Sequence, residues 1–208
     1  IRLNKLKFKL KLGITLLKDS WPLILNSIFI AFYMKIDQVM IKQILSETEV
    51  GHYAAAVKIS EIWYFIPVVV SASFFPSILN SKKENHLLYE SRIKALYFIM
   101  LWLSIFIGIV TFFLGEYLID ILYGEQYKIA SNILKVHIWS GIFVFIGVVS
   151  GKWLLAENLQ QISMFNTAIG AILNILINYY LIKKIGVLGA AWGTLISYFI
   201  AAYFALLF

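Results

Sequence analysis

The sequence predicts an all-α membrane protein, a polytopic bundle of six transmembrane helices. Composition is the first reason: of 208 residues, 61% are hydrophobic and 14% are charged, and the mean hydropathy of +0.84 is too high for a soluble domain of this size. Length is the second, because apolar runs of about eighteen residues or more, long enough to cross a bilayer core as helices, recur along the chain. The third is a cluster of basic residues before the first run.

Residues 1–18 are predicted to be a basic cytoplasmic segment beside the membrane. It contains six cations, Arg2, Lys5, Lys7, Lys9, Lys11 and Lys18. Such a cluster is typical of the cytoplasmic flank of a membrane helix, so the net charge of +7 does not call for a nucleic-acid partner. The chain opens on Ile1 and stops at Phe208 within an apolar run, so we expect both ends to be cut from a longer protein.

Residues 19–208 are predicted to form a six-helix transmembrane unit, with spans at about 21–44, 52–79, 93–114, 130–156, 162–182 and 187–208. In the first span, Trp21 and Pro22 follow Ser20 as an interfacial aromatic residue and a first-turn proline. In the second span, Pro67 predicts a bend, because an interior proline removes a backbone hydrogen bond. The polar residues 80–92 are predicted to form a second cytoplasmic loop.

The last four spans differ in their polar content. The third has no internal charge, and residues 115–131 after it are expected to form a short interfacial helix and turn on the outer side. The fourth contains glycines that are plausible bending points. Four-residue intervals follow in the fifth span (Asn166, Gly170, Asn174 and Asn178) and in the sixth (Gly189, Gly193 and Ser197). The first set is a polar stripe, and small residues at the second spacing let helix backbones approach closely.

Four charged residues lie well inside the first two spans, and each costs about 2.5 to 3.5 kcal/mol at the centre of a membrane helix. The short connection predicts an antiparallel hairpin, so depths can be counted from Thr48. Asp37 and Lys58 lie eleven and ten residues from it, and Lys35 and Glu61 each lie thirteen away. Both opposite-charge pairs are therefore expected at nearly equal depth, either as structural ion pairs or beside a polar pathway.

Several motifs occur in a characteristic order: Asp37-Gln-Val-Met-Ile, Gly51-His-Tyr-Ala-Ala-Ala-Val-Lys-Ile-Ser-Glu61, Phe74-Phe-Pro76, Leu122-Tyr-Gly-Glu-Gln-Tyr127 and Gly186-Val-Leu-Gly-Ala-Ala-Trp-Gly-Thr194. This set, covering residues 20 to about 200, resembles the second half of Wzx-type oligosaccharide-lipid flippases. They belong to the multidrug/oligosaccharidyl-lipid/polysaccharide exporter superfamily. The resemblance implies two six-helix lobes facing a central cavity, of which this chain is the C-terminal lobe and the N-terminal lobe is missing.

The resemblance also implies a function: an undecaprenyl-diphosphate-linked glycan would be moved across a bacterial inner membrane by alternating access. Membrane lipid is then a partner, and neither a cofactor nor an enzymatic activity is expected. Lysine ammonium groups suit a diphosphate. The candidate diphosphate contacts are Lys35 and Lys58, with Lys152 at the cytoplasmic side and Lys42 as a weaker choice. Candidates for the sugar are Asn174 and Asn178. Asp37 and Glu61 could hold the lysines between occupancies or couple transfer to protons.

Each of these assignments has a structural alternative. Lys42 and Lys152 lie near span ends and could extend to lipid headgroups, and the asparagine stripe could serve interhelical hydrogen bonds. Two other functions also stay open. A cation-coupled multidrug or metabolite exporter of the same superfamily would use Asp37 and Glu61 for ion coupling. A membrane glycan polymerase or glycosyltransferase is expected to have a long outward loop with catalytic groups.

Overall fold

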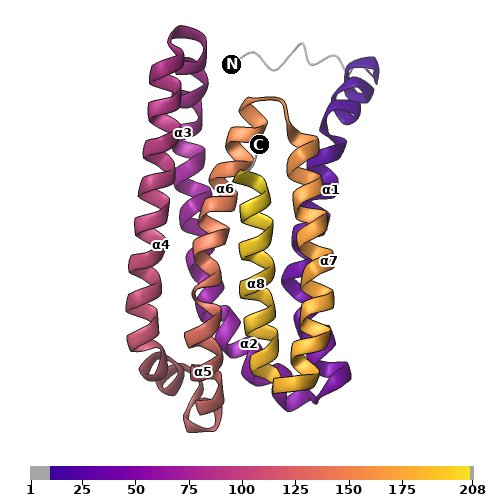
Figure 1. Cartoon of the computed structure of the whole chain (residues 1–208), viewed down its shortest axis with the longest axis vertical. Helices are drawn as coiled ribbons and strands as arrows, with labels where there is room; N and C mark the ends of the chain where they lie inside the picture. The colour runs from indigo at the N-terminus through magenta and orange to yellow at the C-terminus, as the bar shows by residue number, and fades with distance from the viewer. Residues whose placement is uncertain (1–9, 207–208) are drawn as a thin grey trace, which may run out of the picture.

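The computed structural model describes residues 10–206, and this part of the chain consists of α-helices and two short 3-10 segments, without strands (Figure 1). The helices are α1 (Leu10–Ile44), α2 (Glu47–Glu61), α3 (Phe65–Glu84), α4 (His86–Tyr123), α5 (Lys128–His137), α6 (Ser140–Ala156), α7 (Gln160–Ile185) and α8 (Val187–Leu206). The 3-10 segments are η1 (Ile62–Tyr64) and η2 (Glu125–Tyr127). Of the predicted basic segment, Lys11 and Lys18 lie on α1, and the cations at 2–9 lie outside the described residues.

Within the described residues, four segments are long and apolar enough to cross a membrane: Ser20–Ile44, Glu47–Glu84, His86–Tyr123 and Gln160–Ile185. A fifth crossing forms if α5 and α6, which meet at an angle of 45°, count as one broken span. The shorter apolar helix α8 packs beside α7 and completes the bundle (Figure 1). The predicted class, an all-α membrane helix bundle, is therefore confirmed, and the predicted number of six spans fits approximately.

Helix α1 and the continuous segment α2–η1–α3, which we call the second rod, form an antiparallel hairpin, as the short connection predicts (Figure 1). Ser46 caps α2, since its side-chain oxygen accepts a hydrogen bond from the Glu49 backbone N–H at 3.3 Å. The second rod is then interrupted by η1, directly before α3. Pro67, where the sequence predicts a bend, lies in the first turn of α3, and its missing N–H leaves the Trp63 carbonyl without its usual helical donor.

Helices α3 and α4 extend further than the sequence suggests. Residues 115–131 do not begin with a separate interfacial helix, because α4 continues to Tyr123. Gly115 instead permits close packing, since a Cβ there would lie 3.0 Å from Cδ2 of Leu134 on α5. The expected loop at 80–92 is reduced to Asn85, whose side chain accepts hydrogen bonds from the backbone N–H groups of Leu87 and Leu88 in the first turn of α4.

The turn between α3 and α4 is joined to the turn between α6 and α7 by a polar clasp. Lys82 Nζ donates to the Ala156 carbonyl at 2.7 Å and lies 2.8 Å from Glu157 Oε2. The Tyr89 hydroxyl donates to Glu157 Oε1. These two turns lie at the same end of the bundle as the start of α1 (Figure 1).

Helices α7 and α8 touch through small residues, as the four-residue spacing predicts. A Cβ on Gly189 would lie 2.2 Å from the Leu181 carbonyl oxygen, and one on Gly193 would lie 1.8 Å from Asn178 Oδ1. Near the other end of the pair, a Cβ on Gly170 would lie 2.8 Å from the Ala201 Cβ. A Cβ at Gly189 would thus meet the α7 backbone, and one at Gly193 would displace the Asn178 side chain, so glycine permits the close approach of the two helices.

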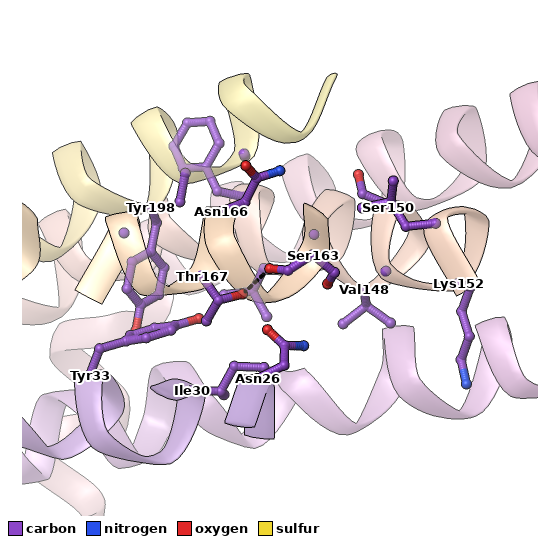
Figure 2. A pocket seen from close by; sticks show the side chains of 18 of the residues that line it. Asn26, Ile30, Tyr33, Val148, Ser150, Lys152, Ser163, Asn166, Thr167 and Tyr198 are labelled. Atoms are coloured by element: carbon purple, nitrogen blue, oxygen red, sulfur yellow. Dashed lines mark hydrogen bonds between the residues drawn. The ribbon is translucent and has the colours of Figure 1, made fainter. Parts of the chain in front are cut away.

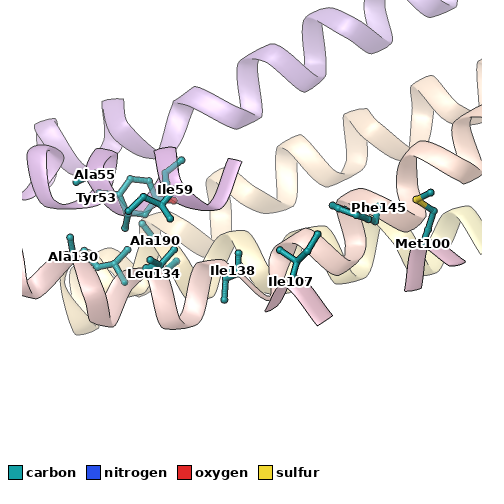
Figure 3. Packing of buried hydrophobic residues seen from close by; sticks show 14 of the residues in the cluster. Tyr53, Ala55, Ile59, Met100, Ile107, Ala130, Leu134, Ile138, Phe145 and Ala190 are labelled. Atoms are coloured by element: carbon teal, nitrogen blue, oxygen red, sulfur yellow. The ribbon is translucent and has the colours of Figure 1, made fainter. Parts of the chain in front are cut away.

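Part of the buried apolar core lies where α2, α5 and α8 meet. Figure 3 shows Tyr53 and Ile59 of α2 beside Ala130 and Leu134 of α5, with Ala190 of α8 close by. The last three of these residues are fully buried. This packing fixes the lower part of the second rod, and it holds Tyr53 in the position from which its hydroxyl reaches α1.

Candidate functional site

A buried carboxylate, Asp37, is the most unusual polar group in the bundle, with a relative exposure of 3%. Its Oδ2 accepts hydrogen bonds from the Tyr53 hydroxyl and from Thr194 Oγ1, each at 2.7 Å. Its Oδ1 accepts one from Asn178 Nδ2 at 2.6 Å. Four helices, α1, α2, α7 and α8, therefore converge on one carboxyl group.

The close α7–α8 contact brings this cluster together. Gly193 directly precedes Thr194 and lets α8 lie against Asn178. The neighbouring Asn174 is fully buried, and its Oδ1 also accepts from Asn178 Nδ2, at 3.1 Å. Two atoms, Asn174 Nδ2 and Asn178 Oδ1, are buried without a hydrogen-bonding partner. The cluster thus surrounds a carboxylate with neutral donors and retains unused hydrogen-bonding capacity.

The remaining charges of the hairpin lie on its outside. Lys35 Nζ is 3.5 Å from Glu61 Oε2, with side-chain exposures of 62% and 20%. Lys58 is exposed, and no ion pair joins it to another described residue. We call Lys35, Lys58 and Glu61 the cationic face. Of the two expected pairs, Lys35–Glu61 forms, and Asp37–Lys58 does not, because Asp37 points into the bundle and Lys58 away from it.

The other two lysine candidates, Lys152 and the weaker choice Lys42, lie apart from this face. Lys42 is 2.8 Å from Glu47 across the α1–α2 turn, where both side chains are highly exposed. Lys152 lies over the Phe75 ring, 5.2 Å from its centroid, on the side of α6 that meets α3. The structure therefore divides the sequence candidates among the Asp37 cluster, the cationic face, the exposed α1–α2 turn with Lys42, and the lining of a cavity that includes Lys152.

A cavity of about 350 Å³ lies between α1, α6, α7 and α8 (Figure 2). Its walls are mainly apolar, and the polar side chains among its lining residues include Asn26, Tyr33, Ser163, Asn166, Thr167 and Tyr198. Asn26 Oδ1 and Asn166 Nδ2 are buried without a partner. No group of acidic, histidine or cysteine side chains suited to a metal ion occurs in residues 10–206.

Sequence reasoning missed Tyr53, Thr194 and the cavity. Tyr53 and Thr194 lie in motifs that the resemblance highlights, but neither carries charge, and Thr194 is 157 residues from Asp37. The available signal was geometric, because an asparagine stripe on one helix requires a polar group on a neighbour. His137 is buried and hydrogen-bonded to Ser60 at 3.0 Å, and its ring meets the Tyr53 ring edge to face with the centroids 6.0 Å apart.

Comparison with curated proteins identifies relatives whose names refer to glycan or polysaccharide biosynthesis and to O-antigen transport. A probable low-salt glycan biosynthesis flippase of Haloferax volcanii is 28% identical over 178 residues, which cover 84% of this chain and 37% of the relative. A capsular polysaccharide biosynthesis protein of Staphylococcus aureus is 23% identical, with coverages of 86% and 46%. A Shigella dysenteriae protein whose name assigns it to O-antigen transport is 25% identical, with coverages of 91% and 46%. The chain thus spans less than half the length of these relatives.

Solved structures show the same fold. An outward-facing multidrug resistance MATE family transporter of the MOP superfamily matches with a TM-score of 0.76 and 18% identity, covering 89% of this chain and 42% of that one. A MATE protein in a bent conformation gives a TM-score of 0.73 at 19% identity, covering 91% and 43%. The bundle therefore corresponds to one half of such a transporter. The MatE family model matches residues 22–180, which is most of the sequence, and the chain belongs to the MatE family.

Proposed function

We propose that the full-length protein moves a lipid-linked oligosaccharide across the membrane by alternating access, and that this chain is its C-terminal lobe. The names of the relatives support the substrate class, since they refer to glycan biosynthesis, capsular polysaccharide and O-antigen. The undecaprenyl-diphosphate carrier and the bacterial inner membrane come from the sequence resemblance. The protein would act as a transporter and not as an enzyme, with membrane lipid and the missing N-terminal lobe as partners.

The observation that carries this proposal is the cationic face. Lys35 and Lys58 are exposed at positions inside candidate membrane spans, where a lysine without a polar function is costly. A central cavity against the missing lobe would hydrate these ammonium groups, and a diphosphate would bind them as point charges. Glu61 holds Lys35 when no substrate is present, and Lys58 is free to bind first.

Asp37 is proposed to couple transfer to a proton or a small cation. Its charge is buried among neutral donors, so neutralising it changes the energy of this conformation relative to one in which Asp37 meets water. Because Asn174 and Asn178 are fully buried beside Asp37, we now assign them to this carboxylate instead of the sugar. Lys152 remains a proposed cytoplasmic contact for substrate, in competition with its contact to Phe75.

The test is Lys58→Ala in the full-length protein, with transfer of the lipid-linked oligosaccharide as the assay. We expect transfer to fall about tenfold or more, since a hydrogen bond to a charged group contributes roughly 1.5 to 3 kcal/mol. Lys58→Arg should restore most of the activity. The matched control is Lys83→Ala, which removes an exposed lysine at the end of α3. Normal transfer by the Lys58→Ala variant would remove Lys58 from the proposal.

The second candidate function is export of a drug or metabolite coupled to a cation. The buried Asp37 cluster favours it, because such a site serves ion coupling and needs no anionic substrate. The two functions differ in what Lys58→Ala does: drug efflux driven through Asp37 should survive that change, whereas lipid-linked oligosaccharide transfer should not. Asp37→Asn should abolish gradient-driven transport in both cases.

A further inference from the structure

The cavity between α1, α6, α7 and α8 has mainly apolar walls, but its lining includes polar atoms that have no protein partner. Asn26 Oδ1 and Asn166 Nδ2 are buried in its lining without partners, and Asn166 as a whole is only 8% exposed. A buried polar atom left unpaired costs about 1 to 3 kcal/mol, and a water molecule that hydrogen-bonds to such an atom removes that cost. At about 30 Å³ per water molecule, the volume of about 350 Å³ accommodates on the order of ten.

An aromatic pair closes one end of this cavity. The rings of Tyr33 and Tyr198, both in the lining, meet edge to face with their centroids 5.0 Å apart (Figure 2). Tyr33 precedes Asp37 by four residues on α1, and Tyr198 follows Thr194 by four residues on α8. Four residues are about one helical turn, or roughly 6 Å of rise. Each tyrosine therefore lies one turn from a member of the Asp37 cluster, on the same face of its helix.

Helix α7 gives the same order independently. Asn166 and Gly170 line the cavity, and Asn174 and Asn178, the next residues of the stripe, belong to the Asp37 cluster. Along α1, α7 and α8, the sequence of features is thus cavity, aromatic pair, carboxylate. Among the described residues, the lining contains no carboxylate and one lysine, Lys152, which lies over the Phe75 ring.

We propose that the cavity is an aqueous vestibule through which a proton or a small hydrated cation exchanges with Asp37, and that the Tyr33–Tyr198 pair closes it. Exchange occurs at the end of the bundle that carries the start of α1 and the α6–α7 turn. The inference rests on the coupling role proposed for Asp37. It adds a route, a side of the membrane and a closure, each of which can be measured without substrate.

Cysteine labelling tests the vestibule, because the chain contains no native cysteine. Single cysteines are introduced into a full-length protein without other cysteines, in membrane vesicles, and treated with a small cationic methanethiosulfonate reagent. Gly147→Cys reports on the cavity, since a Cβ there meets no atom within 4 Å. Asn174→Cys reports on the far side of the aromatic pair. Ala130→Cys, in the apolar core and fully buried, is the control for a dry position.

We expect Gly147→Cys to react from the side of the α6–α7 turn, and Asn174→Cys to be protected. Adding Tyr198→Ala should accelerate labelling of Asn174→Cys by at least about tenfold, equivalent to roughly 1.4 kcal/mol in the closing equilibrium. Tyr198→Phe keeps the ring and should leave the rate unchanged. The inference would be overturned if Gly147→Cys did not react with the reagent, or if Tyr198→Ala did not change the labelling rate of Asn174→Cys.

Two further results separate the explanations. An equal acceleration at Ala130→Cys would show general loosening of the bundle, and would also overturn the closure. The coupling role fails separately: if Asp37→Asn supports normal gradient-driven transfer, then the labelling pattern can still hold, and the vestibule leads to a residue that does not couple. The labelling assay and the transfer assay therefore fail independently.

Discussion

Replacing Gly193 with alanine should destabilise the bundle and disrupt the Asp37 cluster. The new Cβ would lie 1.8 Å from Asn178 Oδ1 and 3.3 Å from its Cα, so the Asn178 side chain must turn away. Overpacking of this kind costs about 1 to 3 kcal/mol. The lost hydrogen bond from Asn178 Nδ2 to Asp37 adds about 0.6 to 1.7 kcal/mol, the range for interhelical bonds in membranes. The expected loss is about 2 to 5 kcal/mol.

Equilibrium unfolding of the full-length protein in mixed detergent micelles measures this loss. The matched control is Gly147→Ala, where the added Cβ meets no atom within 4 Å, and where alanine should be neutral or gain up to about 1 kcal/mol. A double-mutant cycle identifies the cause: Asn178→Ala removes the obstructing side chain, so it should cost less in the Gly193→Ala background than alone. Gly193→Ala and Gly147→Ala variants within about 0.5 kcal/mol of each other would refute the reasoning.

Two further predictions concern polar contacts. Tyr53→Phe should make the ionised form of Asp37 less favourable, and so shift the pH profile of transport, while preserving the fold, because it removes one donor to the carboxylate at 2.7 Å and leaves the ring in the core; a transport pH profile that matches the unchanged protein would contradict this. The Lys82 ammonium, and then the Tyr89 hydroxyl, hold the pKa of Glu157 below its ordinary value of 4.5. A lowered carboxyl pKa means that the clasp stabilises the bundle above pH 4.5, and that this contribution is lost as the pH falls through the lower, folded-state pKa. The stability difference between the unchanged protein and a Glu157→Gln variant should therefore shrink on acidification, and a difference constant down to pH 3, about 1.5 units lower, would contradict the assignment.

Contacts set by chain length and small-residue spacing could be predicted from the sequence. A short connection forces the α1–α2 hairpin, and counting from its turn places Lys35 and Glu61 at the same depth, where they form an ion pair. Glycine at four-residue intervals gives the close α7–α8 contact. These predictions succeed because they depend on one helix or on two helices joined by a tight turn.

The expected Asp37–Lys58 ion pair does not form, because equal depth in the membrane does not fix the direction in which a side chain points. Residues two apart on a helix point in nearly opposite directions, so Lys35 outside the bundle requires Asp37 inside it. The partners of Asp37 then come from helices that follow more than a hundred residues later, and only their three-dimensional packing identifies them. The cavity is a property of four helices together, and no single segment carries its pattern.

The 3-10 segment η1 allows α3 to rotate about its axis relative to α2. A 3-10 segment turns about 120° per residue and an α-helix about 100°, so converting Ile62–Tyr64 to α-helix would rotate α3 by roughly 60° about its own axis. This rotation would turn the exposed side chains of Phe65 and Val68 toward a different side of the bundle, while α2 stays fixed in the core. Glu61 is the last residue of α2 before η1, so the rotation would begin directly beside the Lys35–Glu61 ion pair.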